Sequence, residues 1–350
     1  MTLSSTNRAA IAVAVILLVG GAALGVYFYR QHRSLPPIPG TAAKQAPDLL
    51  SQLPADAPAV GYIDVAALRA LQNSALAALL GLSSPGPEAD REYAEFVRQT
   101  GFDYTRDLDK AAIAFWPQSF AVAPGGGIGD NRTLAVADGR FDHTKIEAYA
   151  LRTGKIVPNT QPAVYEAPGN PAVWFEFLSD TRIALASGKN AGGLLAGLSH
   201  PAARDAAMNA RIERVAGAPI FAVARTDKLP ESFYANFANA PQLEKLARSV
   251  RSLSLAGKPD GGIIKTGLDA ECDSPKSAAE ISTLLDGFRM VASMALYDPK
   301  TLRQMTKEQA AFLKAFIRQL KVTREDRDVR LRLDITPQML GVRPPSPLAH

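Results

Sequence analysis

The chain is poor in cysteine and histidine. Its 350 residues include one Cys and four His, so Cys272 cannot form an intramolecular disulfide and a cysteine-based zinc site cannot be assembled. A lone Cys in an apolar stretch is usually a small buried residue, which is the role we expect for Cys272. The low cysteine content does not identify the compartment, because many envelope proteins also lack disulfides.

Motifs for catalysis and phosphate binding are absent as well. The sequence contains no Gly-x-Ser-x-Gly motif of a nucleophile elbow. The glycine-rich segment 125–129 and the pair Gly188-Lys189 lack the other residues of a dinucleotide or phosphate loop, so we expect connectors there. His200 precedes Pro201 in a predicted loop without a motif around it. We therefore assign no catalytic, cofactor-binding or metal-binding residues.

A basic surface across the body of the protein is also missing. The net charge is +5, but residues 301–335 alone hold nine basic and five acidic side chains, and Arg8, Arg30 and Arg33 flank the first apolar segment. The region between them is net acidic. A nucleic-acid-binding protein usually carries a basic face on its folded body, so nucleic acid is excluded as a partner.

One long apolar run is present near the amino terminus. Ala9–Tyr29 contains no charged residue, and as a helix it would span about 30 Å, the thickness of the hydrocarbon core of a bilayer. A cleaved signal peptide is the alternative, but its apolar region is usually only about 7–15 residues long and ends at a small-residue site. We predict that residues 1–33 form a single-pass transmembrane anchor that contacts the lipid bilayer through Ala9 to Tyr29.

Two features of the sequence disagree on which side of the membrane the body lies. Counting Lys and Arg on the two sides favours a cytoplasmic body by one residue. A short polar amino terminus before a long apolar run is, however, the usual layout of a segment that exports the chain on its C-terminal side. We expect an extracytoplasmic body. Residues 34–56 are rich in proline and are predicted to form an extended tether between anchor and body.

The body is predicted to be α+β with an internal duplication. Four segments recur in the same order: Ala57–Tyr62 with Ala218–Val223, Leu108–Pro117 with Val250–Pro259, Asp138–Lys145 with Asp269–Lys276, and a hairpin through 174–186 with one through 320–335. This pattern predicts two tandem units, 57–200 and 216–340, followed by a disordered tail at 341–350. Each unit is expected to be an antiparallel sheet covered by helices on one face. The two sheets lie side by side or join into one larger sheet.

Two groups of acidic residues are candidate sites. In the first, Asp103, Asp107 and Asp109 surround Arg106 in a stretch that we interpret as a polar turn with a local ion pair. An acid–base pair would require one raised pKa, usually through burial.

In the second group, Asp138, Asp142 and His143 resemble a metal cluster. We expect Asp142 instead to cap the helix that begins after it. Asp273 is expected to play the same part in the second unit, where Pro275 falls in the first helical turn.

The predicted helix 278–296 is apolar around much of its circumference. Its apolar residues are Ile281, Leu284, Leu285, Phe288, Met290, Val291 and Met294. We expect these side chains to lie in the core. The alternative is that they line a groove for an apolar ligand or a partner helix.

Short motifs suggest a family resemblance. The proline-rich tether, Tyr62–Val65, the segment from Thr100 to Asp109 and Gly139–Asp142 resemble bacterial membrane-anchored proteins that carry an amino-terminal helix and a duplicated α+β envelope domain of unknown function. The resemblance covers most of the chain. It implies a bacterial inner-membrane location and an exported, periplasmic body, and it supplies no activity and no functional residues.

Three functions remain open from the sequence. The first is a non-enzymatic envelope protein whose duplicated body binds or scaffolds another macromolecule, which is the function we expect. The second is a module that binds a lipid or another apolar ligand in a groove between the two units. The third is an enzyme whose site is assembled from residues that are distant in the sequence.

Overall fold

The structure is a computed structural model of the chain. It describes residues 46–69, 91–117, 131–167, 172–199, 204–231, 234, 240–260, 263–297, 307–336 and 339. The predicted anchor 9–29, the glycine-rich segment 125–129, His200 and the tail 341–350 lie outside the described residues. In the part of the chain that is described, no helix is long and apolar enough to cross a membrane.

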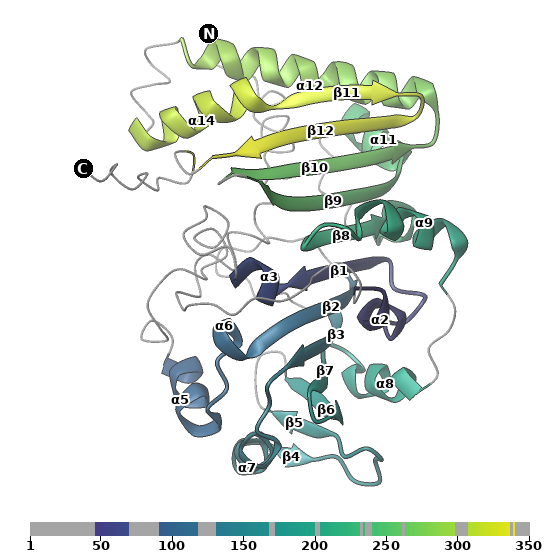
Figure 1. The fold of residues 1–350 in the computed structure, drawn as a ribbon. Coiled ribbons are helices and arrows are strands. Elements are labelled where there is room, and N and C mark those ends of the chain that lie inside the picture. The colour runs from purple at the N-terminus through teal and green to yellow at the C-terminus, as the bar shows by residue number, and fades with distance from the viewer. Residues whose placement is uncertain are drawn as a thin grey trace, which may run out of the picture.

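One antiparallel sheet of 12 strands organises the molecule. The strands lie in the order β11-β12-β10-β9-β8-β1-β2-β3-β7-β6-β5-β4, from the top to the bottom of Figure 1. Their bounds are β1 Ala59–Asp64, β2 Leu108–Trp116, β3 Arg132–Gly139, β4 Lys155–Ile156, β5 Tyr165–Ala167, β6 Val173–Ser179, β7 Arg182–Ser187, β8 Ile220–Arg225, β9 Val250–Asp260, β10 Ile263–Cys272, β11 Lys321–Glu325 and β12 Asp328–Ile335.

The α+β class is thus confirmed, and the two predicted sheets form a single one. The strand order β1-β2-β3-β7-β6 on one side recurs as β8-β9-β10-β12-β11 on the other. The two halves meet where β1 and β8 pair, with Val60 opposite Val223 and Tyr62 opposite Phe221. The rings of Tyr62 and Phe221 stack at a centroid distance of 5.4 Å across this junction.

The face of the sheet that carries Val60, Tyr62, Phe221 and Val223 is called the first face. Three helices cover it over the first half of the sheet and over β8: α2 Ala46–Ser51, α8 Ala191–Ala196 and α9 Ala206–Val215. Figure 1 shows α2 and α8 on one side of the lower strands. Side chains from these helices and from the alternate residues of the strands form the largest buried cluster, which includes Leu50, Trp116 and Met208.

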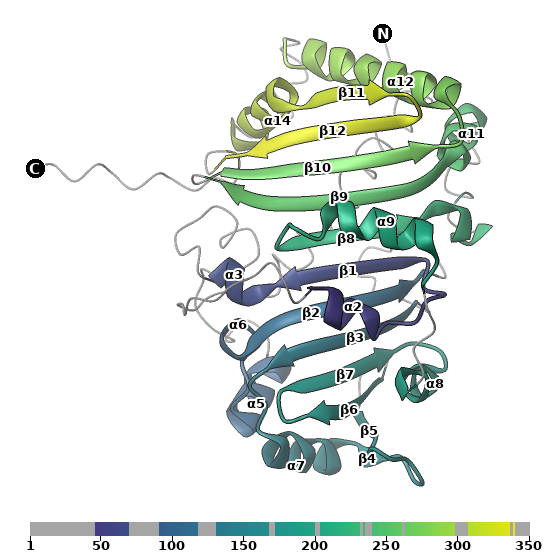
Figure 2. The same ribbon diagram turned by 45° about the vertical axis from the view of Figure 1, so that its right-hand side comes forward.

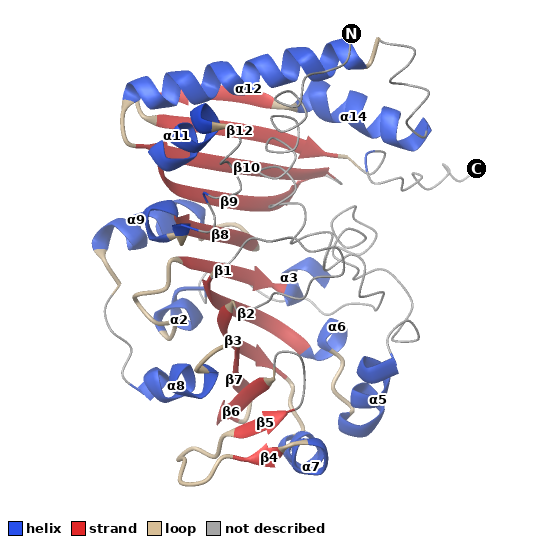
Figure 3. Cartoon of the chain, turned by 180° about the vertical axis from the view of Figure 1, so that it is seen from behind, coloured by secondary structure: helices blue, strands red, loops and turns tan. Residues whose placement is uncertain are grey.

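The opposite face, called the second face, is covered in both halves. Helices α5 Arg91–Thr100 and α7 His143–Thr153 lie at the lower half, where α7 packs on Ala137, Phe175 and Ile183. Helices α11 Pro241–Ser249, α12 Pro275–Ala295 and α14 Lys307–Gln319 lie at the upper half. Figure 2 and Figure 3 show α12 and α14 alongside the outer strands β11 and β12. Two short helices lie beside the ends of strands, α3 Val65–Arg69 after β1 and α6 Tyr104–Asp107 before β2.

The prediction that helices cover one face of each unit was wrong for the first half. That half is covered on both faces, because its strands bury apolar residues on both sides. In the second half, β10 and β12 bury Ala270, Cys272, Val329 and Leu331 against α12 and α14 on the second face. Cys272 is fully buried there, as expected.

Candidate functional site

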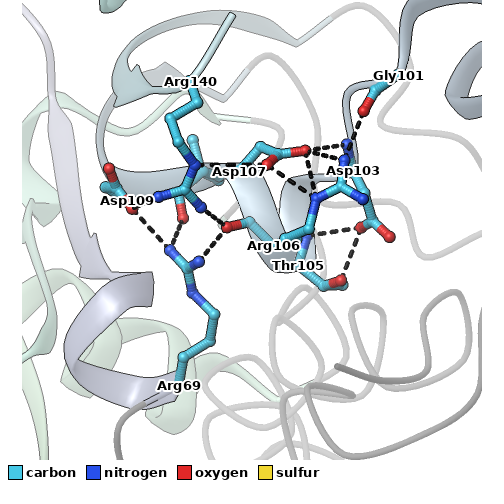
Figure 4. Close-up of polar contacts among 9 residues, drawn as sticks. Arg69, Gly101, Asp103, Thr105, Arg106, Asp107, Asp109 and Arg140 are labelled. Atoms are coloured by element: carbon cyan, nitrogen blue, oxygen red, sulfur yellow. Dashed lines mark hydrogen bonds and ion pairs between the residues drawn. The ribbon is translucent and has the colours of Figure 1, made fainter. Parts of the chain in front are cut away.

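Arg106 and the aspartates around it form a closed cluster rather than an exposed turn (Figure 4). Asp103 is the N-cap of α6 and accepts hydrogen bonds from the backbone N–H and the hydroxyl of Thr105, at 2.9 and 2.7 Å. Arg106 contacts Asp107 at 2.6 Å and donates to the carbonyl of Gly101 at 2.6 Å. The predicted local ion pair is confirmed, and Asp103 and Asp107 are buried within it.

Two further arginines tie this cluster to the rest of the fold. Arg69, at the end of α3, is 5% exposed; it contacts Asp109 at 2.8 Å and donates to two backbone carbonyl groups of the segment 106–108. Arg140 lies 3.5 Å from Asp107 and 3.8 Å from Asp109. The cluster therefore joins α3, α6, β2 and the loop after β3.

The electrostatics of this cluster do not fit acid–base catalysis. Burial opposes the ionisation of Asp107, but hydrogen bonds from the side chain of Arg106 and from the backbone of Asp103 hold the pKa of Asp107 below its usual value. A general acid at neutral pH needs the opposite shift. The cluster is best explained as a structural ion-pair network.

The residues of the apparent metal cluster are separated by the fold. Asp142 caps α7 by accepting from the backbone N–H of Lys145 at 3.1 Å, which confirms the predicted cap. The ring of His143 stacks on Phe177 at a centroid distance of 3.7 Å. Among the described residues, no group of three or more His, Cys, Asp or Glu side chains is placed to hold a metal ion.

In the second unit the predicted cap is shifted by one residue. Ser274, not Asp273, is the N-cap of α12 and accepts from the backbone N–H of Ser277 at 3.2 Å. Pro275 occupies the first turn, where its fixed φ is compatible with the helix. The carboxyl group of Asp273 lies beside this cap. Hydrogen bonds from Ser277 and Ser274 lower its pKa.

A row of charges that the sequence did not predict crosses the first face. The strand register places Asp64, Lys110, Asp138 and Arg182 next to one another on β1, β2, β3 and β7. Arg182 contacts Asp138 at 2.6 Å. Asp64 accepts from the backbone N–H of Ala67 at 2.8 Å, and burial raises the pKa of its carboxyl group. Opposite charges on neighbouring strands stabilise the register.

The helix 278–296 is only partly a core helix. Ile281 and Leu285 pack against the second-face cluster. The side chains toward its C-terminus stay exposed: Met290, Val291 and Met294, together with Tyr297 just beyond the helix. The core interpretation was therefore wrong for this end of the helix, where the apolar side chains do not belong to the buried cluster that Ile281 and Leu285 pack against.

The upper half of the first face is polar and open. The alternate residues that face it on β9, β10 and β12 include Ser252, Ser254, Asp269, Glu271, Asp328, Arg330 and Arg332. These residues form the open polar face. Within the described residues, α9 lies over β8 and β9, and the helices that contact β10 and β12 pack on the second face.

A pocket of about 120 Å³ opens on this face. It is lined by the seven residues of the open polar face and by Arg214 of α9. Glu271 is its most enclosed carboxylate: Arg211 contacts it at 3.0 Å, Arg327 at 3.4 Å and Arg214 at 3.7 Å. Burial opposes the ionisation of Glu271, but Arg211, Arg327 and a hydrogen bond from Ser252 lower its pKa. We take this pocket as the candidate functional site.

Gly267 shapes one wall of the pocket. The guanidinium group of Arg332 lies over Gly267 and pairs with Asp269. A Cβ atom at position 267 would come within 2.9 Å of Nη1 of Arg332. A side chain at position 267 would therefore shift the guanidinium group of Arg332 from this place.

A sequence pattern accounts for two of the eight residues that line this pocket. Apolar and polar residues alternate in Val329–Ile335, which is sufficient to place Arg330 and Arg332 on one face of a strand. This alternation gave no reason to single out Ser254, Glu271 or Arg214, because they reach the pocket only through strand pairing and the packing of α9. No sequence pattern joins residues that far apart.

Comparisons with known proteins give little to transfer. No protein-family model matches the chain, and no curated protein matches it. Among solved structures, crystal forms III and IV of TP0453 align with 10% identity and TM-scores of 0.44 and 0.43, covering 84% of this chain and 96% and 94% of those chains. Crystal form I aligns with 9% identity and a TM-score of 0.43.

Proposed function

We propose that the chain is a non-enzymatic protein of the bacterial inner membrane, anchored through residues 9–29, whose extracytoplasmic body binds a protein partner. The body consists of two tandem α+β units that arose by duplication. The open polar face of the second unit is the surface that the partner contacts.

The observation that carries this proposal is the difference between the two halves of the first face. Over the first half, the strands present mainly apolar residues that α2 and α8 bury, beside the row of charges from Asp64 to Arg182. Over the second half, the strands carry Ser, Asp, Glu and Arg; the two serines are buried, whereas the described helices leave Asp269, Arg330 and Arg332 accessible. Arg, which recurs on this surface, is enriched in protein–protein interfaces, whose rims are polar and accessible to solvent.

The recurrence of the strand order supports the duplication. The five strands of each unit follow the same path, and α7 and α12 both begin directly after the third strand. The described part of the first unit is closed by helices on both faces. Divergence of one copy into a scaffold and the other into a binding surface accounts for this asymmetry.

An apolar ligand between the units has less support. On the first face, Val60, Tyr62, Phe221 and Val223 fill the junction and are nearly inaccessible. An enzymatic function has the least support, because the candidate aspartates serve in the ion-pair cluster or as a helix cap.

Site-specific photo-crosslinking in intact cells tests the proposal. A crosslinking residue at Thr323 of β11 lies on the side of the open polar face, whereas one at the neighbouring Arg324 lies on the opposite side. We expect an adduct of defined mass from position 323 and none from position 324. Equal adducts from both positions, or none from position 323, would contradict a partner on this face.

A further inference from the structure

The pocket on the open polar face is the size of a single functional group. Its volume is about 120 Å³, whereas sites for cofactors and drug-sized ligands usually enclose about 300–1,000 Å³. It is open to solvent and lies on a surface that the proposed partner contacts. A side chain of that partner fits this space better than a free cofactor does.

Hydrogen-bond donors are available inside the pocket. Ser254 is 6% exposed and lines the pocket, so its hydroxyl group can donate to a ligand there. Arg214 stands at the rim with 54% of its side chain exposed, and its ion pair with Glu271 is long, at 3.7 Å. A guanidinium group carries five N–H donors, so Arg214 keeps most of them for a ligand.

The carboxylates of the pocket are already engaged by cations. Glu271 is shared by Arg211, Arg214 and Arg327. Asp269 pairs with Arg332. Arg330 contacts Glu325 at 2.6 Å and Asp328 at 3.9 Å.

The charge balance of this group favours an anion. The lining itself is balanced, with three arginines and three carboxylates, but the ion pairs also bring in Arg211, Arg327 and Glu325 from around it, so that five arginines meet four carboxylates. The excess is greatest around Glu271, where three guanidinium groups share one carboxylate. Arg is also the side chain best suited to bind a carboxylate, through two parallel hydrogen bonds.

We propose that this pocket receives a carboxylate side chain of the partner protein, held by Arg214, Arg332 and the hydroxyl group of Ser254. This inference rests on the proposed function and specifies the chemistry of the contact. Arg332 orients its guanidinium group by lying over Gly267, and Arg214 closes on the ligand from α9.

The test uses the full-length protein in detergent micelles and the blocked peptide acetyl-Gly-Glu-Gly-amide as the probe, with binding measured by saturation-transfer NMR at low salt. The matched peptide acetyl-Gly-Gln-Gly-amide and inorganic phosphate serve as comparison probes. We expect the Glu peptide to bind and the Gln peptide to bind at least tenfold more weakly. Equal binding of the two peptides, or binding of phosphate alone, would overturn the inference.

Three variants locate the binding. Arg214→Gln removes one of the proposed ligands, and Gly267→Ala displaces the guanidinium group of Arg332 without changing the net charge. We expect each to weaken binding of the Glu peptide at least fivefold, with the circular dichroism spectrum unchanged. Arg324→Gln removes the same charge from the opposite side of β11 and should leave binding unaltered. Wild-type affinity in the first two variants, or an equal loss in Arg324→Gln, would refute the site.

The two proposals fail in different ways. If position 323 gives a crosslink but peptide binding does not depend on Arg214, the partner surface is supported and the carboxylate pocket is refuted. Peptide binding without a crosslink establishes an anion pocket and removes the proposed partner.

Discussion

Two buried charged side chains, Arg69 and Glu176, show how differently burial acts on single residues. Arg69 contacts Asp109 and two backbone carbonyl groups, so its charge is compensated. Glu176 lies on β6 opposite Ala184 with 4% of its surface exposed, and burial raises the pKa of its carboxyl group to about 6. The first residue stabilises the fold through its partners, whereas the second costs stability when it is ionised.

Replacing Arg69 with Ala removes the buried donor to the carbonyl of Leu108 and the 2.8 Å contact with Asp109, and leaves Arg140 as the remaining partner of Asp109 and of the Arg106 carbonyl. We expect a loss of about 2–4 kcal/mol in the free energy of unfolding, measured by urea denaturation. Arg98→Ala is the control, because Arg98 is 73% exposed and pairs only within its own helix with Glu95. A similar effect of both substitutions would show that burial does not set the strength of the Arg69 contacts.

Glu176 predicts a pH dependence of stability. Because its pKa is higher in the folded state than in the unfolded state, protonation favours folding, and this favourable effect is complete below the ordinary pKa of 4.5 and lost as the pH rises through about 6. Glu176→Gln removes this titrating group. The change in the free energy of unfolding between pH 4.5 and pH 7 should therefore differ from that of the wild type by about 1–2 kcal/mol. The exposed Glu213→Gln on α9 should retain the wild-type change. An unchanged profile in Glu176→Gln would contradict the assignment.

At the scale of elements, α12 combines two environments along one helix. Its first half contributes Ile281 and Leu285 to the core, and its last turns expose Met290, Val291 and Met294. The helix begins where Ser274 caps it and runs for 21 residues, so its last turns lie well beyond Ile281 and Leu285, which pack on the buried cluster of β10 and β12. The apolar periodicity alone predicted a core helix along its whole length, because periodicity does not show which other elements pack against a helix.

This division predicts unequal effects of substitution. Met294→Gln should change the free energy of unfolding by less than about 0.5 kcal/mol, since Met294 is 66% exposed. Leu285→Ala should cost about 1–2 kcal/mol, because this side chain packs against the buried cluster of β10 and β12. Thermal or urea unfolding of the two variants compares them directly. A larger loss for Met294→Gln would place this residue in a core that the described packing does not contain.

At the scale of the whole molecule, the pairing of β1 with β8 turns two predicted units into one structure. Residues of both units form a common cluster on the first face, and the register at the junction is unbroken from Ala59 to Ile63. Separating the units would expose Tyr62 and Phe221 and create two free strand edges. Edges of this kind are unfavourable in native proteins.

We therefore expect the body to unfold in a single cooperative transition. The two Trp residues, Trp116 and Trp174, both lie in the first unit, whereas far-UV circular dichroism reports on both units. The urea midpoints from the two signals should coincide. Separate midpoints would show that the units fold independently despite the continuous sheet.

The predicted transmembrane anchor determines where the whole molecule is located in the cell. An uncharged run such as 9–29 is stable in a bilayer and unfavourable in water. We expect the full-length chain to remain in the membrane pellet after alkaline extraction, and the mature protein to keep its first residues by mass spectrometry. Loss of residues 1–33 would identify a cleaved signal instead.

The sequence by itself determined the local features of this protein: the α+β class, the order of recurring segments, the cap at Asp142 and the alternation that places Arg330 and Arg332 together. These depend on contacts between residues close in the chain, or on a period of two along one strand. Only the tertiary structure decided that the strands form one sheet, that Asp64, Lys110, Asp138 and Arg182 align, and that the upper half of the first face stays open. Those features depend on strand register and on which helix packs where, and both are set by interactions between distant segments.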